Sequence, residues 1–564
     1  MSECSVFGIQ GIPPARHPTP VPHIMASEPA VDNPAQVENG NPDLALTAES
    51  ETRIGLWLTV GAVAFVLLVL GLLHAWTTQP DGSLSNDAPY HIAMADLFGQ
   101  AALGRTFPWT QRSIWRDHFY DKELGFHFLL MVVRRWAGLF GYRGDAPPFL
   151  LEDFSLIAAW LAVFLWALWR VGIRQPYVFV PLAVLAVPLF TYRLNLIRPH
   201  VLSSALMVAT AVLLCPARRG EPSLFRTRFM PFFALGILFA YCYSNPHFVL
   251  VPTVLYAVVF VRAQGRSALL PAVGALAGVL AGFVVHPQFP NTFIIWKIQC
   301  VDVVWQALTG AVSDLTTAVE VGRPTRRMLA ENGILFLMAA IGAGSAVWEW
   351  RRGTLSEAGR LFALLAVLTA CGVVLSQRVI EYAVPFTVMA VALAYDARFG
   401  TRGTVFHARA FVAVILVCLA LLPLQRRYFS EEPHVPMPRQ FAEWCRVRLP
   451  PGTCIANLFW DDFPRLFFTA PEYRYTYAMD PMFGYAADPV NYPRLEAMCA
   501  GKIDFPPGPE LQRLLGARLV YVSPGCASTA RRMAAARYAL PYQGLDGWCF
   551  DLEAPPVDHS VGRR

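Results

Sequence analysis

The sequence predicts a mainly α-helical membrane protein: a polytopic transmembrane helical bundle of about 11 spans, followed by a C-terminal soluble α/β domain. Of the 564 residues, 55% are hydrophobic and only 15% are charged, whereas a soluble domain contains about 25% charged residues. A mean hydropathy of +0.41 agrees with this deficit. Several apolar segments of about 17 to 23 residues are long enough to cross a hydrocarbon core of about 30 Å.

The apolar segments also predict the orientation of the chain in the membrane. Eleven of them are expected to span: 54–76, 152–170, 177–192, 199–215, 230–244, 246–262, 268–285, 332–350, 361–377, 380–396 and 409–424. Lysine and arginine concentrate in short cytoplasmic loops. With a cytoplasmic N-terminus, the inner short loops and span ends hold fourteen arginines and the outer short loops hold three. An odd number of spans then places the C-terminal domain outside.

Residues 1–50 are rich in proline and polar residues and lack apolar periodicity, which predicts a disordered cytoplasmic tail. Residues 51–424 form the predicted transmembrane domain, with two large outer loops at 77–150 and 286–331. Residues 425–564 read as a periplasmic α/β domain, because short strand-like runs alternate there with helical stretches.

Three elements of these outer regions are expected in more detail. The first outer loop should hold two amphipathic helices, near 87–103 and 121–140. In the C-terminal domain, "CIANLF", "RLVYVSP" and "WCFDLE" are the expected strands. The expected helices lie near 438–448, 493–500, 509–516 and 527–537.

The net charge and the cysteine content of the chain indicate which partners and which cellular compartment to expect. The formal net charge of +6 calls for no nucleic-acid partner, because the arginines cluster in loops where membrane topology accounts for them. The sequence lacks an Asn-x-Ser/Thr acceptor, which favours a bacterial inner membrane over the endoplasmic reticulum. An oxidising compartment permits disulfides in the outer domain, but their pairing stays open. That domain contains five of the eleven cysteines: Cys445, Cys454, Cys499, Cys526 and Cys549.

The stretch "LSNDAPYHIAMADLF", residues 84–98, places Asp87 where the chain leaves the first span. An Asp at this point is typical of a helix N-cap, and the same carboxylate can take a proton from an acceptor hydroxyl. His91 follows four residues later on the same helical face, with Tyr90 beside it. His91 could orient the carboxylate or contact a phosphate, and Tyr90 is a candidate substrate contact.

The stretch "WRDHFYDKELGFHFLL", residues 115–130, is dense in charged groups for a segment that continues into an apolar run. Lys122 and Glu123 are expected to be solvated charges of an interfacial helix. The candidates for the site are Asp117, His118 and His127. Asp and His side chains can hold a divalent ion, but the spacing singles out no ligand set, so no metal ligand or cofactor is assigned.

Histidines collect on the predicted outer face, which membrane topology does not require. A polar, titratable layer on one face suggests chemistry there. Besides the first loop, its candidate substrate-binding members are Arg198, His200, Asn245, His247, His286, Arg378 and Glu381. The planar guanidinium fork suits phosphate oxygens. Arg378 and Glu381, three residues apart at the start of a span, are expected to pair and so hold the arginine in position.

This set of groups suits a lipid-linked phosphosugar as substrate. A polyprenyl tail would stay among the spans, the phosphate would meet arginine, and a carboxylate would activate the incoming hydroxyl. Fixed cations stabilise the charge that develops on a phosphate leaving group. A Gly-rich phosphate cradle for a nucleotide sugar does not occur in the sequence.

The motifs "SNDAPYH", "DKELGFH", "RPH" and "QRVIEYAVPF", together with the order of spans and outer loops, resemble the GT-C superfamily of polytopic glycosyltransferases. The resemblance covers residues 54–564 and implies a polyprenyl-phosphate sugar donor, inversion at the anomeric carbon, and an acidic base in the first outer loop, which by position is Asp87. The paired acids usual in that loop are represented by Asp87 and the separate Asp117. "FWDDFP", residues 459–464, is faintly similar to a Trp-Trp-Asp motif of oligosaccharyltransferases, and little weight is given to its acids.

Two other functions stay open. A transporter or flippase of lipid-linked saccharides would have a similar composition, but transporters tend to place polar groups near the bilayer midplane, often in inverted repeats. A membrane scaffold whose outer domain binds a partner is the second. The favoured function is transfer of a sugar from a lipid-linked donor to an unknown saccharide, lipid or protein acceptor.

Overall fold

The computed structural model describes residues 42–77, 86–100, 104–142, 144, 149–215, 228–303, 305, 322–431 and 436–553. The chain divides into two units, Met1–Thr52 and Arg53–Arg564, and the second unit contains the helical bundle, the outer loops and the C-terminal domain. Of the predicted tail 1–50, residues 1–41 lie outside the described residues, whereas residues 42–50 already belong to α1 (Pro42–Thr77).

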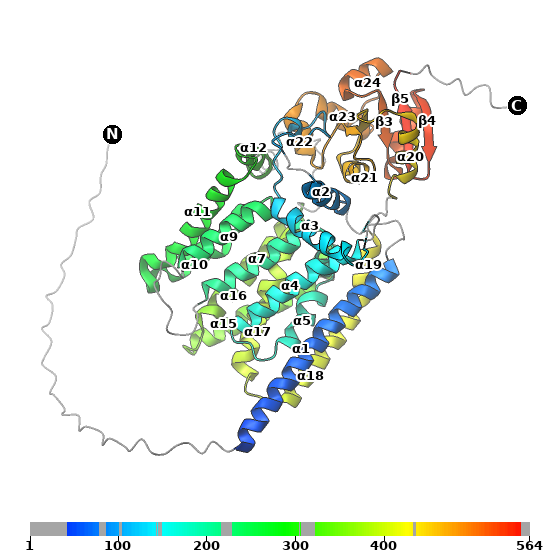
Figure 1. Ribbon diagram of the computed structural model, residues 1–564. Helices are drawn as coiled ribbons and strands as arrows, with labels where there is room; N and C mark the ends of the chain where they lie inside the picture. The colour runs from blue at the N-terminus through cyan, green and yellow to red at the C-terminus, as the bar shows by residue number, and fades with distance from the viewer. Residues whose placement is uncertain are drawn as a thin grey trace, which may run out of the picture. The chain divides into compact units, whose positions relative to one another are not determined.

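Every apolar segment expected to span the membrane is helical (Figure 1). The helices of the bundle are α1, α4 (Leu150–Arg170), α5 (Pro176–Leu185), α6 (Pro188–Leu194), α7 (Pro199–Leu214), α9 (Met230–Cys242), α10 (Leu250–Gln264), α11 (Leu270–Val285), α15 (Gly333–Arg351), α16 (Glu357–Leu375), α17 (Ile380–Phe399) and α18 (Thr404–Ala420). Hydrophobic side chains cover much of their surface, as lipid-facing helices require.

Fewer than eleven of the described helices meet the length and apolarity that a membrane crossing requires. Among the described residues, seven helices are long and apolar enough to cross a membrane, or eight if the bent pair α5 and α6 is one span. The pair bends by 88° where Pro188 begins a new helix, because proline cannot donate the next helical hydrogen bond. Pro246–Val285 is counted as one candidate span, although it contains two of the predicted spans and Gly265 at φ 62° lies between them. Helices α7 and α9 have only 16 and 13 residues.

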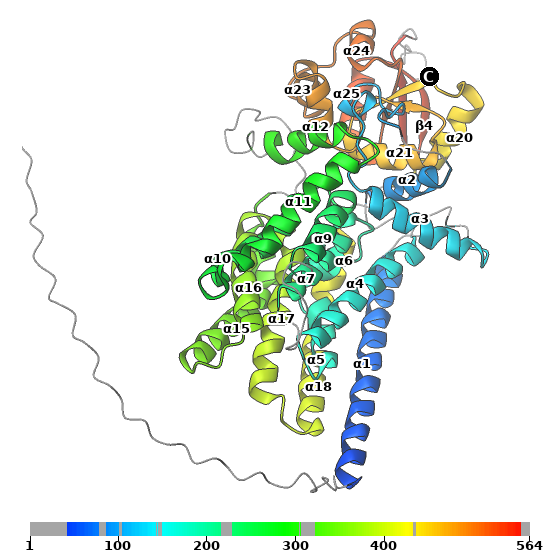
Figure 2. The ribbon, with the colours of Figure 1, turned by 60° about the vertical axis from the view of Figure 1, so that its left-hand side comes forward.

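The first outer loop holds the two predicted helices, α2 (Ala88–Gln100) and α3 (Leu124–Gly138). Both lie at one end of the bundle, between it and the C-terminal domain (Figures 1 and 2). Helix α2 packs on α3 and on α21 (Phe463–Thr469) of the C-terminal domain. The second outer loop contributes α12 (Asn291–Lys297) and α14 (Arg326–Glu331).

The C-terminal domain follows α19 (Leu422–Glu431) and is built on a five-stranded sheet of order β2-β1-β3-β5-β4. Strand β1 pairs in parallel with β2 and β3, and β5 pairs antiparallel with β3 and β4. The three expected strands are confirmed as β1, β3 and β5. The strands are β1 (Cys454–Asn457), β2 (Arg474–Tyr475), β3 (Leu519–Val522), β4 (Ala539–Gly544) and β5 (Gly547–Asp551).

The four expected helices of this domain are confirmed as α20 (Arg439–Arg448), α23 (Asn491–Cys499), α24 (Gly508–Leu515) and α25 (Ala527–Ala535). Two helices that were not predicted, α21 and α22 (Pro481–Ala487), lie between α20 and α23 in the chain. The five cysteines of the domain are free thiols, so the structure joins none of them in a disulfide.

The first outer loop is joined to the sheet of the C-terminal domain by backbone hydrogen bonds. Tyr475 N donates to Trp109 O at 2.7 Å, and Gln111 N donates to Tyr475 O at 2.8 Å. Arg112 N extends the ladder to Thr476 O at 2.8 Å. The loop thereby covers the edge strand β2, whose backbone would otherwise present unpaired groups. The two outer regions form one body as a result.

Within the bundle, α9 and α11 approach each other closely because glycines line their contact. A Cβ on Gly278 would overlap the carbonyl of Phe233, and a Cβ on Gly236 would overlap that of Ala275. A Cβ on Gly274 would lie 2.6 Å from Phe229 O. Small residues at intervals of four are what lets two membrane helices pack backbone to backbone.

Replacing Gly278 by Leu should therefore force α9 and α11 apart. Overpacking of this kind costs about 1–3 kcal/mol, which would appear as a lower thermal unfolding midpoint in detergent. Gly344→Leu on α15 is the matched control, because no atom lies within 4 Å of a Cβ at that position. An equal midpoint for the two variants would contradict the close α9–α11 contact.

Candidate functional site

Asp87 stands immediately before α2, and its backbone carbonyl accepts the first helical hydrogen bond from His91 N at 3.1 Å. Its side chain faces the bundle: Asp87 Oδ2 lies 3.0 Å from Nε of Arg198. Arg198 is the N-cap residue of α7, so this ion pair ties the first outer loop to a membrane helix. The two side chains are 23% and 15% exposed, which leaves the pair accessible to a ligand.

A second arginine reaches the same turn from the C-terminal domain. Arg465 of α21 donates to Asn86 Oδ1 at 3.3 Å and to Asp462 Oδ1 at 2.9 Å. Arg465 and Asp462 are both buried. Asn86 and Asp87 are therefore held from two sides, by Arg465 of the outer domain and by Arg198 of the bundle.

The acids of "FWDDFP" therefore lie near the start of α2, which the sequence did not suggest. Asp461 and Asp462 lie in the short helix Trp460–Asp462 that leads into α21. Burial raises the pKa of the Asp461 carboxyl; nearby Arg465 opposes this shift and the Asp87 charge adds to it. Arg465, which pairs with Asp462, also contacts Asn86, so the motif is a neighbour of the predicted base.

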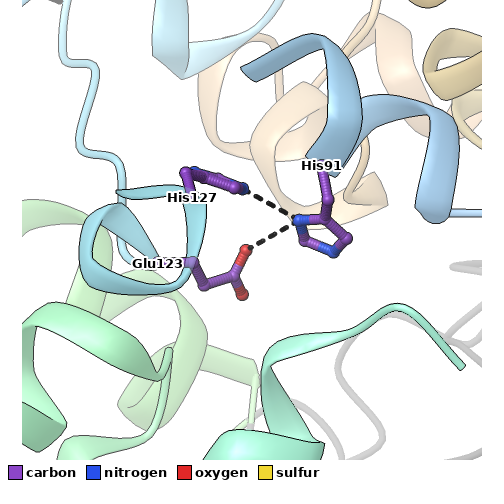
Figure 3. A group of neighbouring side chains, drawn as sticks. All are labelled: His91, Glu123 and His127. Carbon is purple, nitrogen blue, oxygen red and sulfur yellow. Dashed lines mark hydrogen bonds and ion pairs between the residues drawn. The ribbon is translucent and has the colours of Figure 1, made fainter. Parts of the chain in front are cut away.

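A buried cluster of ionisable groups joins the N-terminal parts of α2 and α3 (Figure 3). His91 Nδ1 lies 2.9 Å from His127 Nε2, within hydrogen-bonding distance. His127 Nδ1 lies 2.9 Å from Asp121 Oδ2, and Glu123 Oε2 lies 3.8 Å from His91 Nδ1. His91, Glu123 and His127 bring one ligand atom each to within 4.8 Å of one another, so they could hold a metal ion.

The surroundings of His91 and Glu123 shift the pKa values of both groups. Burial lowers the pKa of His91 well below its usual range, and His127, Arg198 and Lys122 lower it further. Burial raises the pKa of Glu123, against the opposing effect of Lys122.

The prediction that Lys122 and Glu123 are solvated is wrong. Glu123 is only 6% exposed, and the Lys122 ammonium lies 5.6 Å from the centroid of the Phe483 ring of α22. The C-terminal domain covers this stretch, and local sequence does not reveal a cover that comes from a distant part of the chain.

Tyr90, a predicted substrate contact, is buried in an aromatic cluster between the first loop and α21. Its ring stacks on Trp115 at 5.9 Å and lies 6.3 Å from Phe463 and 6.2 Å from Phe467. The structure thus gives Tyr90 a packing role that fixes α2 against the C-terminal domain.

Two predicted catalytic residues lie outside the buried cluster. Asp117 and His118 are exposed on the loop between the two helices. Asp117 lies 3.9 Å from Arg116, at the limit of an ion pair. Their exposure gives no support to a role as base or as phosphate contact.

Glu381 has a different partner from the one expected. Its Oε1 accepts a hydrogen bond from Arg193 Nε at 2.7 Å, and both side chains are buried. His200 Nδ1 lies 3.9 Å from the same oxygen, and its Nε2 lies 2.8 Å from Arg193 O. Arg193, which belongs to α6 and lies 188 residues earlier in the chain, is thus a partner of Glu381 that the sequence did not predict. The pairing of Glu381 with Arg378 stays a prediction.

The remaining candidates form a second polar group beside α12. Trp296 donates to His247 Nδ1 at 3.4 Å, and Cys300 Sγ lies 3.2 Å from Asn245 Oδ1. The His286 ring lies 4.9 Å from that of Tyr120, next to the Gln288 side chain that accepts a hydrogen bond from Asp121 N at 2.6 Å. This contact connects the second group to the buried cluster.

Sequence reasoning missed Asp121, Glu123, Arg193 and Arg465. The spacing of Glu123 and His127, four residues apart at the start of a helix, was a signal for one pair. The sequence contains no comparable signal for Arg193 and Arg465, because each contacts a residue from a distant part of the chain.

Comparison with known proteins shows the fold. No protein-family model and no curated protein sequence matches the chain. Among solved structures, the Archaeoglobus fulgidus oligosaccharyltransferase in the apo form is similar at 12% identity and a TM-score of 0.52, over 89% of this chain and 75% of the other.

ArnT from Cupriavidus metallidurans bound to undecaprenyl phosphate is similar at 13% identity and a TM-score of 0.54, over 90% of this chain and 99% of the other. A third structure, the archaeal oligosaccharyltransferase AglB in complex with an inhibitory peptide and a dolichol-phosphate, has a TM-score of 0.52 at 12% identity. The fold implied by the resemblance to GT-C glycosyltransferases is therefore confirmed: the chain has the fold of ArnT and of the archaeal oligosaccharyltransferase.

The buried position of Arg465 yields a prediction for stability. Arg465→Ala would leave Asp462 buried without its guanidinium partner, and breaking a buried pair in this way costs about 3–5 kcal/mol. Burial raises the pKa of Asp462 and Arg465 opposes the shift, so without Arg465 the folded-state pKa rises further. Ionisation of a carboxyl whose folded-state pKa is raised costs stability, so the deficit should be larger at about pH 8 than at about pH 5.

The measurement is the thermal or denaturant midpoint of the purified chain at both pH values. Arg446→Ala is the matched control: its ion pair with Glu472 is largely exposed, with side chains 48% and 28% accessible, and should contribute less than about 1 kcal/mol. A deficit for Arg465→Ala that is no larger than the control, or that shrinks as the pH rises, would contradict the pairing.

Proposed function

We propose that the protein is an inverting glycosyltransferase that moves a sugar from a polyprenyl-phosphate donor to an acceptor on the outer, periplasmic face of the inner membrane. The observation that carries the proposal is the Asp87–Arg198 pair, partly exposed at the end of the bundle that faces the C-terminal domain. It places a carboxylate and a guanidinium side by side, in a chain with the fold of ArnT and of the archaeal oligosaccharyltransferase.

In this reaction Asp87 is the general base. Its carboxylate takes the proton of the acceptor hydroxyl while the acceptor oxygen attacks the anomeric carbon from the side opposite the phosphate. The bond between the anomeric carbon and the phosphate oxygen breaks, and the electron pair leaves with the phosphate. Attack from the opposite side inverts the anomeric carbon. Proton transfer by a positioned carboxylate contributes about 10²–10⁴-fold in rate.

Arg198 serves the leaving group. Before the donor binds, its guanidinium pairs with Asp87 at 3.0 Å. A guanidinium presents several N–H donors, so Arg198 can contact a phosphate oxygen while it stays close to Asp87. Fixed positive charge at the developing phosphate lowers the barrier electrostatically. Arg378 is the second arginine proposed for the phosphate.

The orientation is part of the proposal. The excess of arginine in the loops at the opposite end supports a cytoplasmic N-terminus. The C-terminal domain and helices α2 and α3 lie together at the other end of the bundle (Figure 1), where a lipid-linked donor and a water-soluble acceptor can meet. The lipids bound in the similar structures, undecaprenyl phosphate and a dolichol-phosphate, support a polyprenyl donor.

The direct test is Asp87→Asn, assayed with the purified protein and a panel of polyprenyl-phosphate sugars by product analysis. The amide cannot accept the proton, so product formation should fall about 10²–10⁴-fold, with unchanged membrane insertion and elution in gel filtration.

The control for this test is Glu510→Gln. Glu510 lies 2.8 Å from Arg494 in an exposed pair on the C-terminal domain, and its neutralisation should leave product formation intact. Undiminished product from Asp87→Asn would refute the role of the base. Substrate movement across vesicles, with no glycosyl product over the whole panel, would support the transporter instead.

A further inference from the structure

We infer that His91, Glu123 and His127 form a binding site for one divalent transition-metal ion of the zinc class, with an open coordination position. The inference rests on the buried cluster at the start of α2 and α3 and does not depend on the proposed glycosyl transfer. The three ligand atoms converge on one point from two separate segments of the first outer loop (Figure 3).

The separations between the ligand atoms are compatible with one shared metal ion. Zinc lies about 2.0–2.1 Å from its nitrogen and oxygen ligands in a tetrahedral arrangement, so two ligand atoms stand roughly 3.3 Å apart. His91 Nδ1 lies 2.9 Å from His127 Nε2 and 3.8 Å from Glu123 Oε2, one below and one above that separation. These two separations bracket the spacing that one ion requires, and the ligand atoms of all three residues lie within 4.8 Å of one another.

The surrounding groups prepare the ligands. Asp121 Oδ2 lies 2.9 Å from His127 Nδ1, and a proton on this nitrogen leaves the Nε2 lone pair directed at the cluster. Asp121 is itself held, since its Oδ1 accepts from Glu123 N at 3.2 Å and its backbone N donates to Gln288. A carboxylate behind a metal-binding histidine is the usual outer partner in zinc sites.

The formal charges of the cluster favour a cation, because its carboxylates outnumber its ammonium group. Asp121 and Glu123 supply two carboxylates in a buried position, against the ammonium of Lys122 at 4.0 Å from Glu123. Arg198, the other nearby cation, is already paired with Asp87.

The donor set selects the class of ion. Two imidazoles and one carboxylate suit zinc, cobalt and iron, whereas magnesium and calcium prefer oxygen ligands throughout. Three protein ligands are typical of sites that keep a position for water or substrate oxygen, and closed structural sites have four. The open position would take a water or a phosphate oxygen.

The test is metal binding by the purified full-length protein in detergent, stripped with a chelator and then loaded with Co(II) or Zn(II). We expect about one ion per chain by elemental analysis and the visible absorption of four- or five-coordinate Co(II). His91→Ala and His127→Ala should lose the absorption and bind at least 10-fold more weakly. His118→Ala, which removes an exposed imidazole of the same loop, should bind as the unchanged chain does.

Alanine at a buried position can unfold the chain, so Glu123→Gln provides a variant of nearly equal volume. It should elute in gel filtration as the unchanged protein does and bind Co(II) at least 10-fold more weakly. Failure of the unchanged protein to retain either ion would overturn the inference, as would full binding by Glu123→Gln or by a folded double variant lacking both histidines. The two proposals can fail separately. A chain that forms glycosyl product but binds no metal would refute the metal site and leave the proposed function intact.

Discussion

The position of two consecutive residues governs the rest of this site. Asn86 is held by Arg465 of the C-terminal domain at 3.3 Å, and Asp87 by Arg198 of the membrane bundle at 3.0 Å. The turn that begins α2 is thus fixed between two parts of the chain, and neither part contains both arginines. The backbone ladder from Trp109 to Arg112 along β2 strengthens the same junction. The site therefore exists only when the bundle and the outer domain are folded against the first loop.

The cover supplied by the outer domain changes the chemistry of the loop beneath it. Tyr90 packs against the rings of Phe463 and Phe467, and Phe483 covers Lys122. These contacts exclude water from a region that contains His91 and Glu123. In such surroundings each electrostatic contact is stronger, and an unpaired charge is more costly. Asp121 accordingly pairs with His127, which in turn lies within hydrogen-bonding distance of His91.

Two kinds of chemistry meet within one helical turn. Asp87 and His91 stand one turn apart at the start of α2, joined by the backbone hydrogen bond of 3.1 Å. The side chain of Asp87 faces the bundle, while that of His91 faces His127 of α3. The proposed proton transfer and the proposed metal site share this helix. A ligand that contacts Arg198 would thus lie near the cluster, because Arg198 is close enough to lower the pKa of His91.

Local patterns in the sequence were sufficient to predict the helices of the bundle, the two helices of the first loop and three strands of the sheet. Periodic or continuous hydrophobicity produces these elements, and it acts over a few turns of chain. The same patterns identified Asp87, His91, Arg198 and His127, because these polar residues stand out at the ends of apolar segments. The bend at Pro188 and the shortness of α7 and α9 were not predicted, since a hydrophobic run does not reveal where its helix breaks.

Tertiary contacts decided which polar groups meet. Arg465 contacts Asn86 across 379 positions of sequence, and Arg193 contacts Glu381 across 188. The burial of Lys122 and Glu123 likewise depends on a domain that begins far later in the chain. Such pairs leave no periodic signal, because their partners are brought together only when separate hydrophobic surfaces pack.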